Sequence, residues 1–109
     1  RLIPREETTH VALLKSTRGS HELFDEAYSH AKKMNIKHAF EQFNLLFREF
    51  HDVRAAYNAA ILAEAMGSME EAYALMAEVV GTGEISRAQR QWDRMQRTLE
   101  AQKQIQGGE

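Results

Sequence analysis

Apolar residues recur every three or four positions along most of this chain, and that spacing is typical of amphipathic helices. The pattern starts after residue 20 and is interrupted at short polar or glycine-containing segments. It predicts five helices, at about residues 21–33, 36–50, 52–66, 68–81 and 86–104. We therefore expect an all-α fold in which each helix buries one apolar face against its neighbours.

Residues that commonly cap helix N-termini precede each of these segments. The candidate caps are Ser20, Asn35, Asp52, the capping-box pair Ser68 and Glu71, and the pair Ser86 and Gln89. Gly67 follows the third segment and suits the left-handed backbone conformation that often ends a helix.

The first two helical hairpins repeat one another. The stripe Phe24, Ala27, Tyr28 and Ala31 recurs 32 residues later as Ala56, Ala59, Ala60 and Ala63. The stripe Ile36, Ala39, Phe43 and Leu46 recurs 33 residues later as Met69, Ala72, Met76 and Val79. Self-similarity at this period is the signature of a helical repeat protein.

The second copy resembles the tetratricopeptide repeat (TPR) family. The residues that carry the resemblance are Tyr57-Asn58-Ala59-Ala60, Ala63, Gly67, Glu71-Ala72, Met76 and Val79. The resemblance covers about residues 21–81 and implies an αα-hairpin superhelix, a right-handed solenoid with repeats at 21–50 and 53–80. Residues 86–104 resemble the solvating helix that closes such arrays, which makes 20–105 one helical domain.

Residues 1–19 differ from the rest and form a short extended N-terminal arm in this interpretation. Val11 and Leu13 alternate at period two, which predicts a strand or an extended linker from an upstream domain. The segment 2–6 followed by 11–14 resembles the junction before such repeats in some bacterial envelope lipoproteins. That resemblance implies the periplasmic side of the envelope, with the cytoplasm as the alternative compartment.

In the TPR family the first helix of each repeat lines a concave groove for a peptide. The residues that the resemblance places there are Asp25, Glu26, Ser29, Lys33, Arg54, Tyr57, Asn58 and Ile61. An asparagine at the place of Asn58 often bonds the ligand backbone, and the alternative is that it bonds its own backbone. The acidic residues of the first helix favour a basic or mixed-charge peptide over a bound carboxylate.

Helix 86–104 carries a heptad-like apolar seam. Its members are Ile85, Ala88, Trp92, Met95 and Leu99. The seam packs either on the preceding helix or on a second chain, as a homodimer. Arg87, Arg90 and Arg94 form a stripe on the opposite face, where we expect solvation.

The composition argues against nucleic-acid binding and metal binding as functions of this chain. The 14 basic and 16 acidic residues give a net charge of −2, which offers no general field for nucleic acid. There is no cysteine, and the five histidines show no metal-binding spacing, although His30 and His38 are placed to meet across a turn. We expect no cofactor, no metal and no membrane-spanning segment.

The sequence thus predicts a protein–protein interaction scaffold without catalysis. Two alternatives stay open. One is a homo-oligomerisation module that uses helix 86–104 or an open repeat end. The other is an accessory domain of a larger enzyme or transport-related protein.

Overall fold

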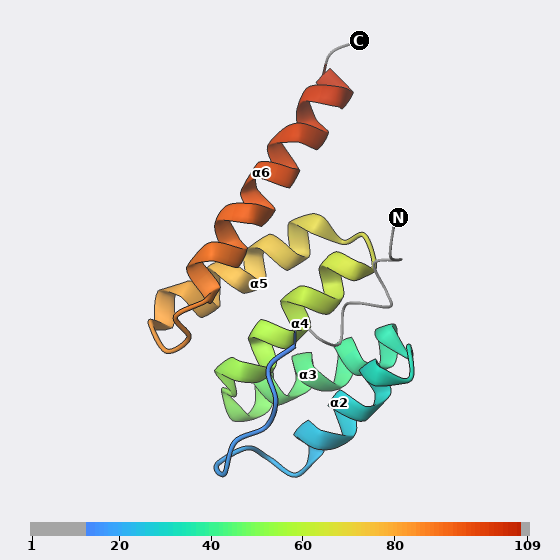
Figure 1. Ribbon diagram of the computed structural model, residues 1–109, viewed down its shortest axis with the longest axis vertical. Coiled ribbons are helices and arrows are strands. Elements are labelled where there is room, and N and C mark those ends of the chain that lie inside the picture. Colours follow the sequence, from blue (N-terminus) through green and yellow to red (C-terminus); the bar gives the residue numbers. More distant parts are fainter. Residues whose placement is uncertain (1–12, 108–109) are drawn as a thin grey trace, which may run out of the picture.

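The structure is a computed structural model that describes residues 13–107, and Figure 1 shows its arrangement. The described residues form five helices and no strand, which confirms the predicted all-α class. The helices are α2 (Leu23–Lys32), α3 (Ile36–Phe50), α4 (Val53–Ala65), α5 (Met69–Thr82) and α6 (Ala88–Gly107).

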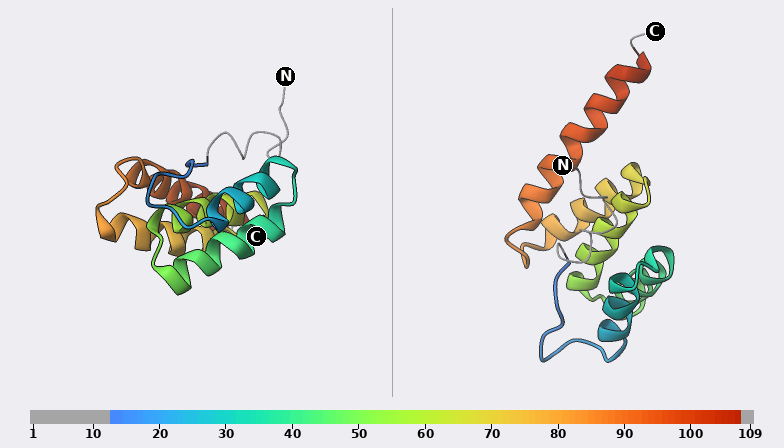
Figure 2. Two further views of the ribbon diagram at one scale, coloured as in Figure 1. Left: turned by 90° about the horizontal axis from the view of Figure 1, so that it is seen from below. Right: turned by 45° about the vertical axis from the view of Figure 1, so that its right-hand side comes forward.

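Each helix packs against the next one along the chain, from α2 to α6 (Figure 1). The connections are short, so successive helices form hairpins. The long helix α6 packs along α5 and continues past the body of the molecule (Figures 1 and 2). The described chain is therefore an open stack of helices, with α4 at its centre.

The central helix α4 is buried almost all the way round because its side chains are small. Its alanines 55, 56, 59, 60 and 63 have no exposed surface. Small residues let the axes of neighbouring helices approach closely, and α4 packs against both α3 and α5. A larger residue on this surface would separate the helices.

The expected N-cap of the third helix forms as predicted. The Asp52 side chain accepts a hydrogen bond from the Ala55 amide at 3.1 Å. Gly67 has a φ of 87°, the left-handed conformation expected after this helix.

Other capping predictions were wrong. Asn35 and Ser68 occupy the N-cap positions of α3 and α5, but neither side chain makes a capping hydrogen bond. Ser20 does not cap α2, because Glu22 is at the N-cap and the Ser20 hydroxyl accepts from the Thr17 amide instead. Ser86 lies in a turn two residues before α6 begins.

The segment between residue 13 and α2 is non-helical: it lies across the helices and turns at residues 17–20 (Figure 1). Figure 2 shows it on the opposite side of the helices from α3. The predicted strand therefore has no counterpart at residues 13 and 14, and its remaining residues lie outside the described chain. The lipoprotein-like segment 2–6 lies outside it as well.

Candidate functional site

Asn58 on α4 binds the main chain of the N-terminal segment. Its Oδ1 accepts from the Leu14 amide at 2.7 Å, and its Nδ2 donates to the Leu14 carbonyl at 2.9 Å. Asn58 has no exposed surface, so both hydrogen bonds are shielded from water. One side-chain amide thus satisfies both polar main-chain groups of one extended residue.

Arg54 lies four residues before Asn58 and therefore on the same face of α4. Its Nε donates to the Lys15 carbonyl at 3.2 Å, and its Nη2 donates to the same oxygen. Two side chains of α4 thus hold consecutive residues of the segment. Both contacts are made to main-chain atoms, so they do not depend on the identity of Leu14 or Lys15.

The side chains of Leu13 and Leu14 supply the apolar part of the contact. They are only 5% and 8% exposed and belong to the same core cluster as the helices. We call residues 13–15 the arm segment, and the surface of α4 around Arg54 and Asn58 the arm site. The arm site combines main-chain recognition with burial of two apolar side chains.

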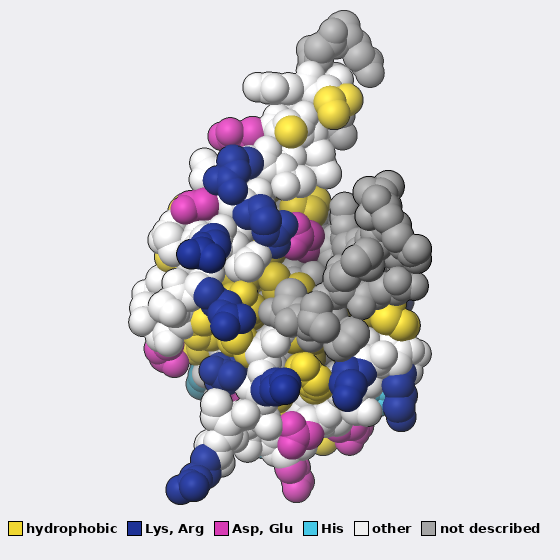
Figure 3. All heavy atoms as spheres, viewed as in Figure 1, with side chains coloured by type: hydrophobic (Ala, Val, Ile, Leu, Met, Phe, Trp, Pro, Cys, Tyr) yellow, Lys and Arg dark blue, Asp and Glu magenta, His cyan; other side chains and the backbone are white. Residues whose placement is uncertain are grey.

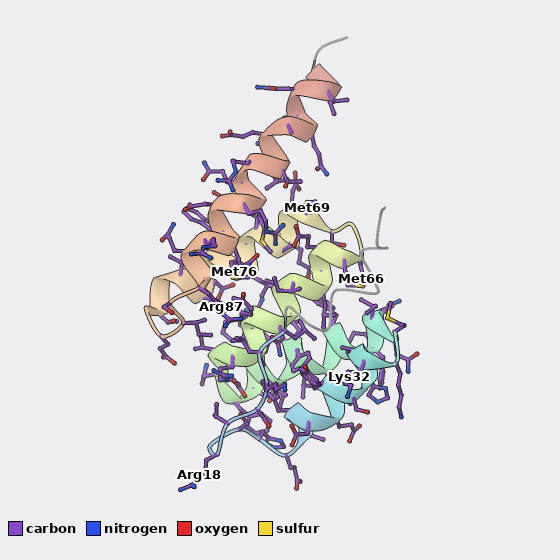
Figure 4. The ribbon with its side chains drawn as sticks, viewed as in Figure 1. Arg18, Lys32, Met66, Met69, Met76 and Arg87 are labelled. Carbon is purple, nitrogen blue, oxygen red and sulfur yellow. The ribbon has the colours of Figure 1, made fainter. Side chains whose placement is uncertain are left out.

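Tyr57, the residue before Asn58 on α4, is buried beside the start of α6. The Tyr57 ring is fully buried, and its hydroxyl makes no hydrogen bond of good geometry although Arg87 and Gln91 lie beside it. Burial raises the pKa of Tyr57, and the nearby Arg87 guanidinium offsets part of that effect. Figure 4 shows Arg87 near the start of α6, turned toward α4.

A second contact ties α6 to α4. Arg94 makes a two-point ion pair with Glu64, in which Nη2 donates to Oε1 at 2.7 Å and Nη1 donates to Oε2. The hydrogen bond to Glu64 raises the pKa of Arg94. The expected solvated stripe of Arg87, Arg90 and Arg94 is therefore wrong at Arg94, which is half-buried in an ion pair.

Lys and Arg side chains follow one another down the face seen in Figure 3. Arg87, Arg90 and Arg97 of α6 and the preceding loop line one open hollow of about 870 Å³ together with Asp93. Although the net charge is −2, this face is predominantly basic.

Of the four groove residues predicted on the first helix, three share one surface depression and the fourth bonds to α3. Asp25, Ser29 and Lys33 line one shallow depression of about 440 Å³ on α2, with Tyr28 and Lys32. Glu26 instead accepts from the Gln42 side chain of α3 at 2.9 Å. Of the residues predicted on α4, Arg54 and Asn58 meet at the arm segment, while Tyr57 and Ile61 are buried in the core.

The predicted seam packs inside the molecule. Ala88 and Met95 are fully buried, and the remaining members Ile85, Trp92 and Leu99 pack partly buried against the core. The Trp92 ring stacks on Tyr73 of α5, with 5.2 Å between ring centroids. The seam residues are thus occupied by contacts within the chain.

The histidine rings of residues 30 and 38 meet as anticipated, with centroids 4.4 Å apart. Among residues 13–107, however, no three histidine or carboxylate side chains converge closely enough to hold a metal ion. In the same part of the chain, every helix is too short or too polar to span a membrane.

The sequence left two roles open for Asn58, a bond to a ligand backbone or a bond to its own backbone, and the structure shows it bonded to the chain's own backbone at Leu14. Leu13 and Leu14 are two adjacent apolar residues followed by the polar run 15–22. That contrast indicates that the two leucines are buried against the helices, since leucine side chains are usually buried in folded proteins.

No protein-family model, curated protein or solved structure in our comparisons matches this chain.

Proposed function

We propose that this chain is a protein-interaction scaffold of the TPR type, with no chemistry of its own, that holds one extended polypeptide segment against α4. The observation that carries the proposal is the pair of hydrogen bonds from Asn58 to the main chain of Leu14. A buried side-chain amide that pairs with the N–H and the C=O of one residue is suited to binding extended backbone.

The repeat pattern supports a concave surface at this place. In the proposed solenoid, α2, α4 and α6 are the first helices of successive hairpins, and α3 and α5 form the other layer. Such a surface is lined by first helices, and the arm segment lies on α4 on the side away from α3 (Figure 2).

Charged side chains line the hollows on α2 and near the start of α6, and they bear on the partner. They include Asp25, Lys32 and Lys33 on α2, and Arg87 and Arg90 near the start of α6. The excess of cations on this face favours a mixed-charge partner with acidic residues beside the bound segment over a basic one.

A peptide-display selection on the full chain tests the proposal. Multivalent display retains weak binders, so a groove of low affinity still enriches sequences. We expect enriched peptides with two adjacent branched apolar residues and flanking acidic residues.

The selected peptides are then tested on Asn58→Ala and on the control Asn35→Ala, which removes an exposed asparagine without a side-chain capping bond. Binding should fall by about tenfold or more on Asn58→Ala, since two shielded hydrogen bonds are lost. Equal binding to both variants, or no enrichment at all, would contradict the proposal.

A further inference from the structure

We propose that the arm segment is an exchangeable occupant: a partner segment with two adjacent branched apolar residues displaces it from the arm site. This inference rests on the proposed function and adds the partner's chemistry and its regulation. In the chain by itself, residues 13–15 fill the place that the partner would take.

The contacts that hold the arm segment are transferable to another polypeptide. Asn58 and Arg54 bind carbonyl and amide groups that every extended residue other than proline carries. The remaining contribution is the burial of two leucine side chains, which any pair of similar apolar residues reproduces. The arm site therefore selects for an apolar pair in extended conformation.

The residues between the arm segment and α2 make hydrogen bonds of their own, which do not involve the arm segment. Residues 17 and 20 bond each other, through Thr17 amide to Ser20 Oγ at 2.9 Å and Ser20 amide to Thr17 carbonyl at 3.0 Å. The start of α2 is held separately, by the Leu23 amide donating to His21 Nδ1 at 3.0 Å. Release of residues 13–15 breaks neither set of bonds.

The turn at residues 17–20 is largely exposed, since only Ser20 of its four residues is partly buried. It borders an open hollow of about 450 Å³, whose other wall is the connection between α3 and α4 at Phe50 to Val53. Figure 4 shows the Arg18 side chain pointing away from the molecule at this turn. The turn thus has room to move with its own hydrogen bonds intact.

Covalent attachment makes the arm segment a strong competitor. A short tether gives an effective concentration of about millimolar, so a free peptide with the same contacts binds the intact chain weakly. Weakening the attached copy should restore the affinity of the free one, because the fraction of open sites rises.

The test measures binding of a labelled probe peptide to full-length chains by fluorescence anisotropy. The probe is a synthetic copy of residues 8–18, with the sequence TTHVALLKSTR. In the variant Leu14→Pro the attached arm loses the amide that Asn58 binds. We expect this variant to bind the probe about tenfold more tightly than the unmodified chain.

A second variant leaves every contact residue unchanged. Insertion of Gly-Gly-Ser-Gly-Gly-Ser after Gly19 lengthens the tether and lowers its effective concentration. We expect it to bind the probe several-fold more tightly than the unmodified chain, and this variant decides the question if Leu14→Pro loses helicity. Arg18→Gln is the matched control and should bind like the unmodified chain, since the Arg18 side chain is exposed and points away from the molecule (Figure 4).

The outcomes separate this inference from the function on which it rests. Equal probe binding by the unmodified chain and the two arm variants would overturn exchange but preserve a peptide-binding groove. Absence of probe binding in all variants would contradict the proposed function itself. Conversion of the insertion variant to a dimer, with no probe bound, would assign the arm site to a second copy of the chain and overturn the inference.

Discussion

Among single residues, Asn58 shows why a side-chain amide fits position 58 better than a carboxylate or a hydrophobic side chain. The carboxamide carries one acceptor and two donors, so it matches the amide and carbonyl of Leu14 at once. A carboxylate retains only acceptors, and its charge would be buried at a position with no exposed surface. The identity of this residue is therefore set by the segment that it binds.

Replacing Asn58 by alanine should destabilise the fold by about 2–3 kcal/mol, because the buried amide and carbonyl of Leu14 both lose their partner. Urea unfolding followed by circular dichroism measures this change. The exposed Asn35 offers a matched control, for which we expect a change within about 0.5 kcal/mol. Equal effects at the two positions would show that the Asn58 hydrogen bonds contribute no net stability.

Tyr57 gives the fold a dependence on alkaline pH. Burial favours the neutral phenol, so the folded chain retains this proton to higher pH than the unfolded chain. The stability linked to neutral Tyr57 is complete below the ordinary tyrosine pKa of 10.0 and is lost as pH rises through the raised pKa. The urea midpoint of the unmodified chain should therefore be lower above pH 10.0 than below it.

Tyr57→Phe should remove this particular loss of stability. It eliminates the ionisable group together with a buried hydroxyl that makes no good hydrogen bond. Removing such a hydroxyl is nearly neutral or mildly stabilising near neutral pH, by about 0–1 kcal/mol. An alkaline decline of the same size in both proteins would rule out Tyr57 as its source.

At the scale of helices, the two-point ion pair between Glu64 and Arg94 fixes α6 against α4. Glu64 is 14% exposed and Arg94 is 41% exposed, so the pair is partly shielded from solvent. A double-mutant cycle with alanine should give a coupling energy of about 1 kcal/mol. The pair Arg48 and Glu78, at 3.9 Å and about half exposed, should couple by less than about 0.3 kcal/mol. Equal coupling in the two pairs would contradict this ranking.

The helices were predictable because their apolar residues repeat at helical spacing, and α3 matches its predicted range of 36–50 in full. The caps were less predictable because a suitable residue type does not ensure a suitable backbone. The Asp52 backbone is extended, with ψ at 104°, and its side chain reaches the helix. At Asn35 and Ser68 ψ is 67° and 69°, and neither side chain makes the bond.

At the scale of the whole molecule, the arm site joins residues 44 positions apart in the chain. Periodicity describes relations within a helix and its immediate neighbours, so it indicates that Asn58 lies on α4 without indicating what it meets. From the resemblance to TPR proteins we expected Asn58 to bind the backbone of a peptide ligand. The structure places the chain's own arm segment there, a long-range contact that local sequence patterns do not encode.

In the proposed exchange, the arm site holds one extended main chain at a time, either the arm segment or a partner. Amide hydrogen exchange of the full-length chain, followed by NMR, tests it at the Leu14 amide. We expect protection of this amide in the free chain and faster exchange when the 8–18 probe peptide is added, with the amides of α4 still protected. Exchange of the Leu14 amide at the unprotected rate in the free chain, or at a rate unchanged by saturating probe, would contradict it.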